Sequence, residues 1–285
     1  MDYVNCKLCP RQCGADRTAG KTGFCGGSDQ MLVAKAMVHP WEEPALAGSG
    51  GSGAIFFGGC TLGCTYCQNR AISGSPVGAP TDSAGLRKIM EALIAQGAEN
   101  IDLVTPTHYL PTILPALTPK LPVPVVYNCG GYERIETIRR LNGLVDIYLP
   151  DLKYADSQLA KDLSCAADYF PVAAAAIREM VSQVGAVQWK DGKVVRGVII
   201  RHLILPGQVE NSLKVLDWIG ETFQKGQVLV SLMRQYTPMP GMETPFDRPV
   251  TDEEYEAVLS WMYLNDLPGF TQEKDASSTA FIPDF

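Results

Sequence analysis

Strand-like and helix-like segments alternate in this chain from residue 54 onward, and this alternation constrains its fold more than any other feature. Apolar segments rich in β-branched and aromatic residues predict strands at Ala54–Phe57, Ile101–Thr105, Val123–Asn128, Val145–Leu149, Val198–Leu205 and Val228–Met233. Amphipathic segments predict helices at Ser83–Ala95, Tyr132–Leu141, Ser157–Leu163, Ala167–Val184, Asn211–Phe223 and Asp252–Leu264. Continuous apolar runs are typical of parallel strands that are buried on both faces. The order therefore predicts an α/β protein with a parallel sheet.

Repeated strand–helix units without internal sequence repetition favour an α/β barrel, closed or partial, over an open doubly wound sheet. Periodicity alone does not separate these two architectures. We expect a partial (β/α)6 barrel, similar to a TIM barrel, in residues 51–285, and a loop-rich arm in residues 1–50. The glycines from Gly48 to Gly53 match G-x-G-x-x-G, but they precede a strand, so we interpret them as a turn or linker. In a barrel, functional groups gather at the carboxyl ends of the strands.

Three cysteines follow the first predicted strand directly. Cys60, Cys64 and Cys67 are spaced C-x3-C-x2-C, and thiolates this close in sequence can converge on one metal centre. A [4Fe–4S] cluster that only carries electrons takes four thiolates. A triad leaves one iron free to bind another molecule, which indicates a chemically active cluster. A disulfide interpretation is disfavoured, because three is an odd number and nothing in the chain indicates secretion.

Four more cysteines lie in the predicted arm, where Cys6, Cys9, Cys13 and Cys25 are spaced C-x2-C-x3-C-x11-C. This set predicts a closed second metal site that holds either zinc or a [4Fe–4S] cluster. A cluster would relay electrons, whereas zinc would stabilise an arm that has few apolar residues of its own. The spacing fits both metals. We expect Cys129 and Cys165 to be small buried apolar residues. For Cys129, which ends the third predicted strand, a place facing the site is the alternative.

Composition sets limits on the class of protein. With 46% hydrophobic and 19% charged residues, the chain is typical of a soluble globular protein. Its start, Met1–Cys6, has no signal-peptide pattern, and no apolar run reaches the ~18 residues that span a bilayer. We therefore expect a cytoplasmic protein without a membrane partner. The net charge of -7 argues against nucleic-acid binding over a broad surface.

The chain resembles radical S-adenosylmethionine (SAM) enzymes, and more narrowly the pyruvate formate-lyase-activating-enzyme-like proteins. The segments that carry the resemblance are Phe57–Asn69, Val104–His108, Tyr127–Glu133, Leu149–Tyr154, Arg201–Gly207, Cys6–Cys13 and Ser231–Tyr236. The resemblance implies that SAM chelates the open iron through its amino and carboxylate groups. One electron then cleaves SAM, and the 5′-deoxyadenosyl radical abstracts a hydrogen atom from the substrate.

The same resemblance implies a set of residues around SAM. The three thiols of the triad are the cluster ligands. The cofactor-binding residues are Tyr66, Thr105, Thr107, His108, Asn128, Asp151, Lys153 and Arg201. Asp151 and Lys153 match the family's Asp-x-Lys beside SAM and, two residues apart on a strand, share a face; a surface ion pair is the alternative. Arg201 reaches the SAM carboxylate or ribose, and Tyr66 lies near the adenine or is a core aromatic residue.

The chain departs from the family pattern at one place. Many members have Gly-Gly-Glu after the second strand, which holds the SAM amino group, and here the matching segment is Thr105-Pro106-Thr107-His108. Either the threonine hydroxyls and backbone carbonyls replace the glutamate, or His108 does. We interpret His202 as packing between a strand and a helix, because its neighbour Arg201 takes the opposite face.

The resemblance favours an enzyme that abstracts hydrogen from a backbone glycine of a partner, a glycyl radical enzyme. Hydrogen abstraction from a small molecule or a peptide is the alternative. A non-catalytic electron carrier is disfavoured, since a carrier has no need of an open iron. A flavodoxin- or ferredoxin-like protein is the expected reductant.

Overall fold

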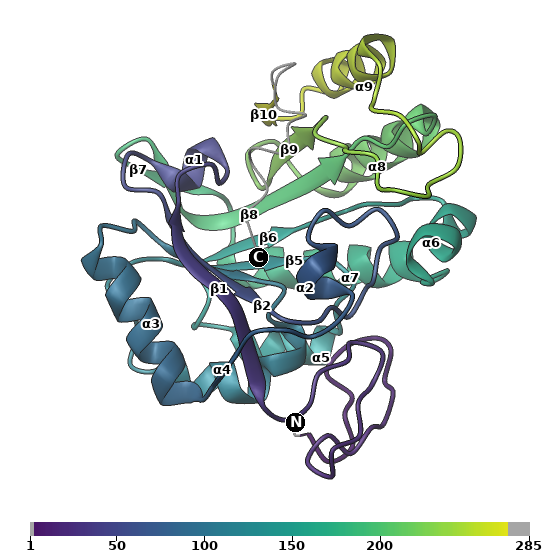
Figure 1. Ribbon diagram of the computed structural model, residues 1–285. Coiled ribbons are helices and arrows are strands. Elements are labelled where there is room, and N and C mark those ends of the chain that lie inside the picture. Colours follow the sequence, from purple (N-terminus) through teal and green to yellow (C-terminus); the bar gives the residue numbers. More distant parts are fainter. Residues whose placement is uncertain (1–2, 273–285) are drawn as a thin grey trace.

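The chain folds around one mixed sheet, seen in a computed structural model that describes residues 3–272 (Figure 1). Among these residues, the sheet has the order β10-β9-β8-β6-β5-β4-β2-β1-β3, with β7 paired to β8. The strands are β1 (Met31–His39), β2 (Ser52–Phe57), β3 (Ala79–Thr81), β4 (Ile101–Val104), β5 (Val125–Cys129), β6 (Ile147–Pro150), β7 (Gln188–Lys190), β8 (Lys193–Leu203), β9 (Leu229–Met233) and β10 (Gly269–Thr271). The helices are α1 (Pro44–Ala47), α2 (Arg70–Ser73), α3 (Ser83–Ala95), α4 (Leu110–Ala116), α5 (Ile135–Ile138), α6 (Ser157–Ser164), α7 (Tyr169–Val184), α8 (Val209–Thr222) and α9 (Asp252–Leu264), with 3-10 turns η1 (Thr107–Tyr109) and η2 (Arg139–Leu141).

The centre of the sheet is parallel. Strands β2, β4, β5, β6, β8, β9 and β10 run in the same direction, and each of the predicted strands overlaps one of the first six. The predicted α/β fold with a large parallel sheet is therefore confirmed. The hydrogen-bonded path ends at β10 on one side and at β3 on the other. The partial barrel stays a prediction.

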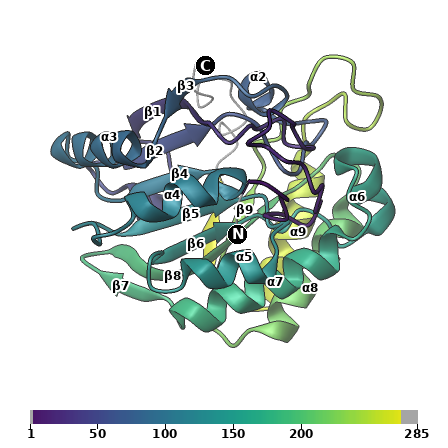
Figure 2. The same ribbon diagram turned by 90° about the horizontal axis from the view of Figure 1, so that it is seen from below.

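Helices of different size cover the two faces of the sheet. The main core lies between one face of the sheet and the helices α3, α4, α7 and α8 (Figure 2). In α3, Leu86, Met90 and Leu93 are buried at helical spacing, and Asp82 caps the helix by accepting a bond from the Gly85 amide. The short α1 and α2 lie on the opposite face. There, Leu46 of α1 packs against strand residues such as Val126 and Ile147.

Residues 31–39 form β1, which the alternation does not predict. This strand pairs antiparallel with β2, so part of the segment 1–50 belongs to the same sheet as the rest of the chain. The residues before β1 are mostly turns and loops without a helix or strand among the described positions 3–30. The division into an arm and a barrel domain stays a prediction. None of the helices within 3–272 is long and apolar enough to cross a membrane.

Candidate active site

The three cysteines of the predicted triad belong to the loop between β2 and α2. Cys60, Cys64 and Cys67 line one cavity of about 230 Å³ at the carboxyl ends of the parallel strands. Burial, with a smaller contribution from the neighbouring thiols of Cys64 and Cys67, raises the pKa of Cys60 to about 12. Neutral thiols are therefore stable here without a metal, and thiolates require a positive partner.

Seven of the eight predicted cofactor-binding residues line the same cavity. They are Tyr66, Thr105, Thr107, Asn128, Asp151, Lys153 and Arg201. They come from the triad loop and from the ends of β4, β5, β6 and β8, which lie far apart in the sequence. Parallel strands bring their carboxyl ends to one edge of a sheet, and this explains the convergence.

Arg201, Asp151 and Lys153 form a buried ionic network beside the thiols. Arg201 Nε donates to Asp151 Oδ1 over 2.8 Å, and Lys153 Nζ lies 2.5 Å from Asp151 Oδ2. Arg201 Nη2 donates to Asn128 Oδ1 over 2.6 Å. Burial opposes the ionised form of Asp151, but the two cations outweigh it and hold the pKa of this carboxyl below its usual value. Because Asp151 is only 8% exposed, the surface ion pair is excluded.

Tyr66 is both a core residue and part of the cavity wall. Its side chain is buried, and its ring packs against Tyr236 with centroids 5.9 Å apart. The hydroxyls of Tyr66 and Tyr154 lie 2.7 Å apart, and Tyr154 contacts Ser164 Oγ at 2.7 Å. Ser164 Oγ in turn donates to Cys64 Sγ over 3.2 Å. This chain of hydroxyls fixes the position of the Cys64 thiol.

His108 does not line the cavity. It lies in η1, is 1% exposed, and its Nε2 donates to the Gly58 carbonyl over 2.8 Å. Burial lowers the pKa of His108 to about 4, so the ring is neutral. Thr107, one residue earlier, points to the other side and donates to Glu133 Oε1 over 2.7 Å. His108 therefore supports the end of β2 instead of reaching a ligand in this cavity.

Glu133 is a cavity residue that the sequence pattern does not single out. It follows β5, lines the same cavity and is 2% exposed. Burial raises the pKa of Glu133 to about 8, although the hydroxyls of Thr107 and Tyr127 act in the opposite direction. Among the described residues no cation forms an ion pair with this carboxyl. Its place in the segment Gly130-Gly131-Tyr132-Glu133, at a strand end, is the signal that would have found it.

The N-terminal cysteines lie together in the loops before β1. Cys6 and Cys9 are buried, Cys25 is half-buried and Cys13 is exposed. Burial raises the pKa of Cys9 to about 12, with Cys25 and Cys6 among the groups that add to the shift. The exposed Cys165 differs from the expected buried residue, because it ends α6 in a left-handed conformation (φ 49°) at the surface.

The cysteine side chains can be compared with the needs of two kinds of metal site, a single metal ion and an iron–sulfur cluster. Within residues 3–272, no group of three or more His, Cys, Asp and Glu side chains is arranged to hold a single metal ion. Thiolates that bind an iron–sulfur cluster attach to different irons, so they need not meet at one point. Three thiols on one cavity with the Lys153 ammonium nearby fit such a cluster, whose thiolates Lys153 would stabilise. The second metal site stays a prediction.

The arm packs directly on the triad loop. Arg11 donates to the carbonyls of Thr61 over 3.2 Å and of Leu62 over 3.0 Å. A side chain at Gly59, which has φ 88°, would contact the Cys25 carbonyl at 2.5 Å. The backbone of the arm thus approaches the loop so closely that only glycine fits.

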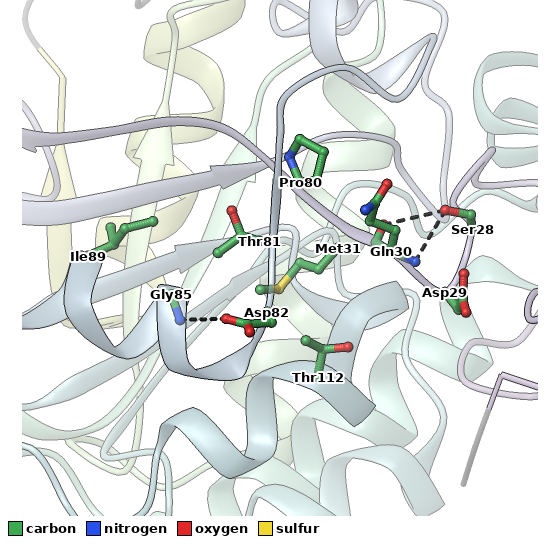
Figure 3. Close-up of a pocket in the computed structure, with 10 residues that line it drawn as sticks. All are labelled: Ser28, Asp29, Gln30, Met31, Pro80, Thr81, Asp82, Gly85, Ile89 and Thr112. Carbon is green, nitrogen blue, oxygen red and sulfur yellow. Dashed lines mark hydrogen bonds between the residues drawn. The ribbon is translucent and has the colours of Figure 1, made fainter.

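Another cavity, of about 950 Å³, lies beside α3 and the loop before β1 (Figure 3). Its lining residues are Ser28, Asp29, Gln30, Met31, Pro80, Thr81, Asp82, Gly85, Ile89 and Thr112. None of the predicted site residues is among them. Asp82 Oδ1 accepts from the Gly85 amide and caps α3, and the Ser28 hydroxyl accepts from the main-chain amide of Gln30. This cavity carries no chemistry related to the thiols.

Comparison with known proteins gives the fold a name. No protein-family model matches this sequence. Among curated proteins, an uncharacterized protein, MJ0674, of Methanocaldococcus jannaschii is 29% identical over 270 residues, which cover 90% of this chain and 74% of that protein.

Solved structures with similar folds decide the architecture. A radical SAM methyltransferase from Sphaerobacter thermophilus matches with a TM-score of 0.54 and 15% identity, over 80% of this chain and 67% of that one. The α/β fold of this chain is similar to that of radical SAM enzymes. SuiB of Streptococcus suis, bound to the precursor peptide SuiA, matches with a TM-score of 0.55 and 14% identity over 76% of this chain. Because the match covers 47% of SuiB, this chain spans about half of that protein's length.

The fold of this chain also matches methylornithine synthase (PylB), with a TM-score of 0.50 and 14% identity over 74% of this chain and 68% of PylB. Identities this low establish the architecture and not the reaction. The predicted similarity to the fold of radical SAM enzymes is therefore confirmed, and the narrower likeness to pyruvate formate-lyase-activating enzymes stays a prediction.

Proposed function

We propose that this protein is a radical SAM enzyme in which Cys60, Cys64 and Cys67 hold a [4Fe–4S] cluster. The observation that carries the proposal is the meeting of three thiols with the Asp151–Arg201–Lys153 network on one cavity of a fold similar to that of radical SAM enzymes. Such a cluster, when reduced by one electron, supplies the electron that cleaves SAM to methionine and a 5′-deoxyadenosyl radical. A flavodoxin- or ferredoxin-like protein is the proposed reductant.

The residues of the cavity supply complementary groups for SAM. Arg201 Nη1, which lies 3.9 Å from Glu42 Oε1, is a donor for the SAM carboxylate or ribose, Asn128 lines the cavity beside it, and the Tyr66 ring gives a flat surface for the adenine. Lys153 favours the thiolate form of Cys64 through its positive charge, against the effect of burial. Thr105 adds a hydroxyl near the end of β4.

We propose Glu133 as the residue that replaces the missing Gly-Gly-Glu. Its carboxyl lines the cavity, and the Thr107 hydroxyl holds one of its oxygens at 2.7 Å. A buried carboxyl without a cation is a favourable partner for an ammonium group, because ion pairing offsets the cost of burial. The SAM amino group would supply that cation.

Two kinds of hydrogen donor are candidates. The resemblance to pyruvate formate-lyase-activating enzymes supports abstraction from a backbone glycine of a glycyl radical enzyme. The likeness to SuiB, which was solved with a precursor peptide, supports peptide modification as the second candidate. For the cysteines of the arm, Cys6, Cys9, Cys13 and Cys25, we propose a zinc ion or a second [4Fe–4S] cluster.

Product analysis tests the proposed function. The chain is reconstituted anaerobically with iron and sulfide, reduced with dithionite and supplied with SAM, and 5′-deoxyadenosine is measured by chromatography. We expect product from the wild type and from Cys165→Ala, a matched control whose thiol is exposed, but not from Cys64→Ala. Absence of product from a fully loaded wild type would contradict the proposal.

A further inference from the structure

A further cavity of about 370 Å³ adjoins the candidate active site. The two cavities share Arg201, Met233 and Gln235 in their walls. Residues 40–48, which belong to the connection between β1 and β2 and include α1, form one wall of the second cavity, and we call them the strap. Leu46 of the strap is 2% exposed and packs on the sheet, so the strap is anchored beside the cavity.

Three carboxyl groups gather where the strap meets the sheet. Glu42 and Glu43 of the strap line the cavity, and Asp102 of β4 lies behind them at 0% exposed. The Glu42 carboxyl has a larger effect on the pKa of Asp102 than any other charged group, and it raises this pKa both through its charge and through a side-chain hydrogen bond. Glu43 Oε1 accepts a bond from Ser231 Oγ over 3.0 Å.

The positive charges near these carboxyls are already used elsewhere. Arg201 is the described cation within 4.0 Å of Glu42, at 3.9 Å, but its Nε and Nη2 donate to Asp151 and Asn128. Within residues 3–272, no ion pair involves Glu43 or Asp102. Asp102 Oδ2 accepts from Asn128 Nδ2 over 3.1 Å, whereas Oδ1, although buried, has no hydrogen-bond partner in the same part of the chain.

Burial and mutual repulsion set the protonation of this group. Burial raises the pKa of Asp102 well above its usual value, and the Glu42 carboxyl adds to the shift. Burial also raises the pKa of Glu43 to about 7, although Arg201 acts in the opposite direction. Groups of this kind ionise when a cation arrives, because its charge replaces the proton.

We propose that the second cavity binds an ammonium or guanidinium group of the substrate from which the radical takes hydrogen. The inference rests on the proposed function, since it needs a radical formed in the adjoining cavity. The Glu42 and Glu43 carboxyls in the cavity wall supply the negative charge, and the buried Asp102 carboxyl lies behind Glu42. Trp41, Met233 and Phe270 in the wall supply apolar and aromatic surface for an alkyl stem and a cation. The substrate class is therefore an alkyl amine or guanidine, either free or as a basic side chain of a peptide.

The test compares charged probes with neutral probes of equal size. Cluster-loaded protein with saturating SAM is mixed with pentylamine or 1-pentanol, and with Gly-Lys-Gly or Gly-norleucine-Gly, and binding is followed by saturation-transfer NMR. We expect at least one charged probe to bind about tenfold more tightly than its neutral partner, which corresponds to ~1.4 kcal/mol. The amine or the peptide then identifies the source of the cation. Equal binding of charged and neutral probes, or no binding, would overturn the inference.

Two variants, and a measurement without SAM, test which residues and which ligand are responsible for the binding. Glu42→Gln is expected to remove most of the charge preference, whereas Glu210→Gln, an exposed control whose side chain is 82% accessible, retains it. If Glu42→Gln does not fold, the comparison on the wild type alone decides. A charged probe that binds only without SAM would assign the carboxyls to the SAM amino group and overturn the inference.

The same samples distinguish failure of the proposed radical SAM function from failure of the proposed cation site. 5′-deoxyadenosine is measured in the same samples after dithionite is added. Product without preferential amine binding would overturn this inference and leave the proposed function intact. Amine binding without product from a loaded cluster would overturn the proposed function and, with it, the assignment of the bound cation to a radical substrate.

Discussion

The guanidinium of Arg11 donates to the main-chain carbonyl of Leu62 over 3.0 Å and so joins the N-terminal arm to the loop that carries the three thiols. The same guanidinium donates to the carbonyls of Thr61 and Ser164 and lies over the Phe24 ring, 3.9 Å from its centroid. One side chain of the arm therefore holds the backbone on both sides of the candidate cluster site.

Removing this contact is expected to destabilise the triad loop. Arg11→Ala loses several charge-assisted hydrogen bonds, and we expect the free energy of unfolding to fall by about 2 kcal/mol. The cluster bound by the triad should also be lost faster to a chelator. Urea denaturation and the decay of cluster absorbance measure these effects. Arg140→Ala, an exposed arginine of η2, is the control, and equal behaviour of the two variants would contradict the role of Arg11.

The buried network around Asp151 is expected to be far more sensitive than a surface ion pair. Asp151→Asn leaves Arg201 and Lys153 without their shared carboxylate, so we expect a loss of about 3 kcal/mol in the free energy of unfolding. The control is Asp266→Asn, whose partner Lys225 is 67% exposed, and we expect a loss of less than about 1 kcal/mol. Urea denaturation compares the two. Similar losses would show that burial does not set the strength of the Asp151 network.

Glu133→Gln is expected to raise the free energy of unfolding and to lower the affinity for SAM. The pKa of Glu133 is raised to about 8 from 4.5, so at pH 8 the folded chain holds a carboxyl that ionises more easily when unfolded. A neutral amide removes this penalty of roughly 4 kcal/mol, but it also weakens the hydrogen bonds from Thr107 and Tyr127, so we expect a net gain of about 2 kcal/mol at pH 8. SAM affinity should fall about tenfold, measured by equilibrium dialysis on the cluster-loaded protein. Glu136→Gln, 63% exposed, is the control. Unchanged SAM affinity in Glu133→Gln would exclude it as the partner of the amino group.

His202 is expected to make stability depend on pH. Its Nδ1 donates to the Leu152 carbonyl and its Nε2 accepts from Ser212 Oγ, and burial lowers its pKa to about 4 from 6.5. As the pH falls, His202 therefore binds a proton at a higher pH in the unfolded chain than in the folded chain. The contribution of neutral His202 to the free energy of unfolding is fully present above pH 6.5. As the pH falls towards 4, the free energy of unfolding decreases by roughly 3 kcal/mol.

Urea denaturation between pH 4 and pH 7.5, on the wild type and on His202→Asn, isolates this effect. The variant should be less stable at pH 7, because it loses a hydrogen bond, and the gap should narrow as the pH falls. A gap that is independent of pH would contradict the assignment.

The parallel strands were predictable because each is a short apolar run, and such runs need no knowledge of distant partners. Strand β1 escaped prediction, since it lies among polar loops and exists through its pairing with β2. The β7–β8 hairpin, with Asp191 at φ 51° and Gly192 at φ 75°, carried a local Asp-Gly signal that the apolar pattern did not use.

Side-chain direction limited the prediction of the site. Thr107 and His108 are neighbours in sequence, but η1 turns the first towards the cavity and the second into the core. Asp102 meets Glu42 only because the strap crosses the sheet, which no local pattern predicts. An acidic residue within the apolar strand β4 was nevertheless a signal of a buried partner.

The most direct test of the central claim is the EPR signal of the reduced cluster with and without SAM. In a Cys6→Ala, Cys9→Ala background, any signal from the arm is removed. We predict that SAM shifts the remaining signal, and that adding Cys64→Ala abolishes both the signal and its response, whereas adding Cys165→Ala changes neither. A cluster signal that persists without Cys64, or one that does not respond to SAM in the presence of all three thiols, would contradict the account.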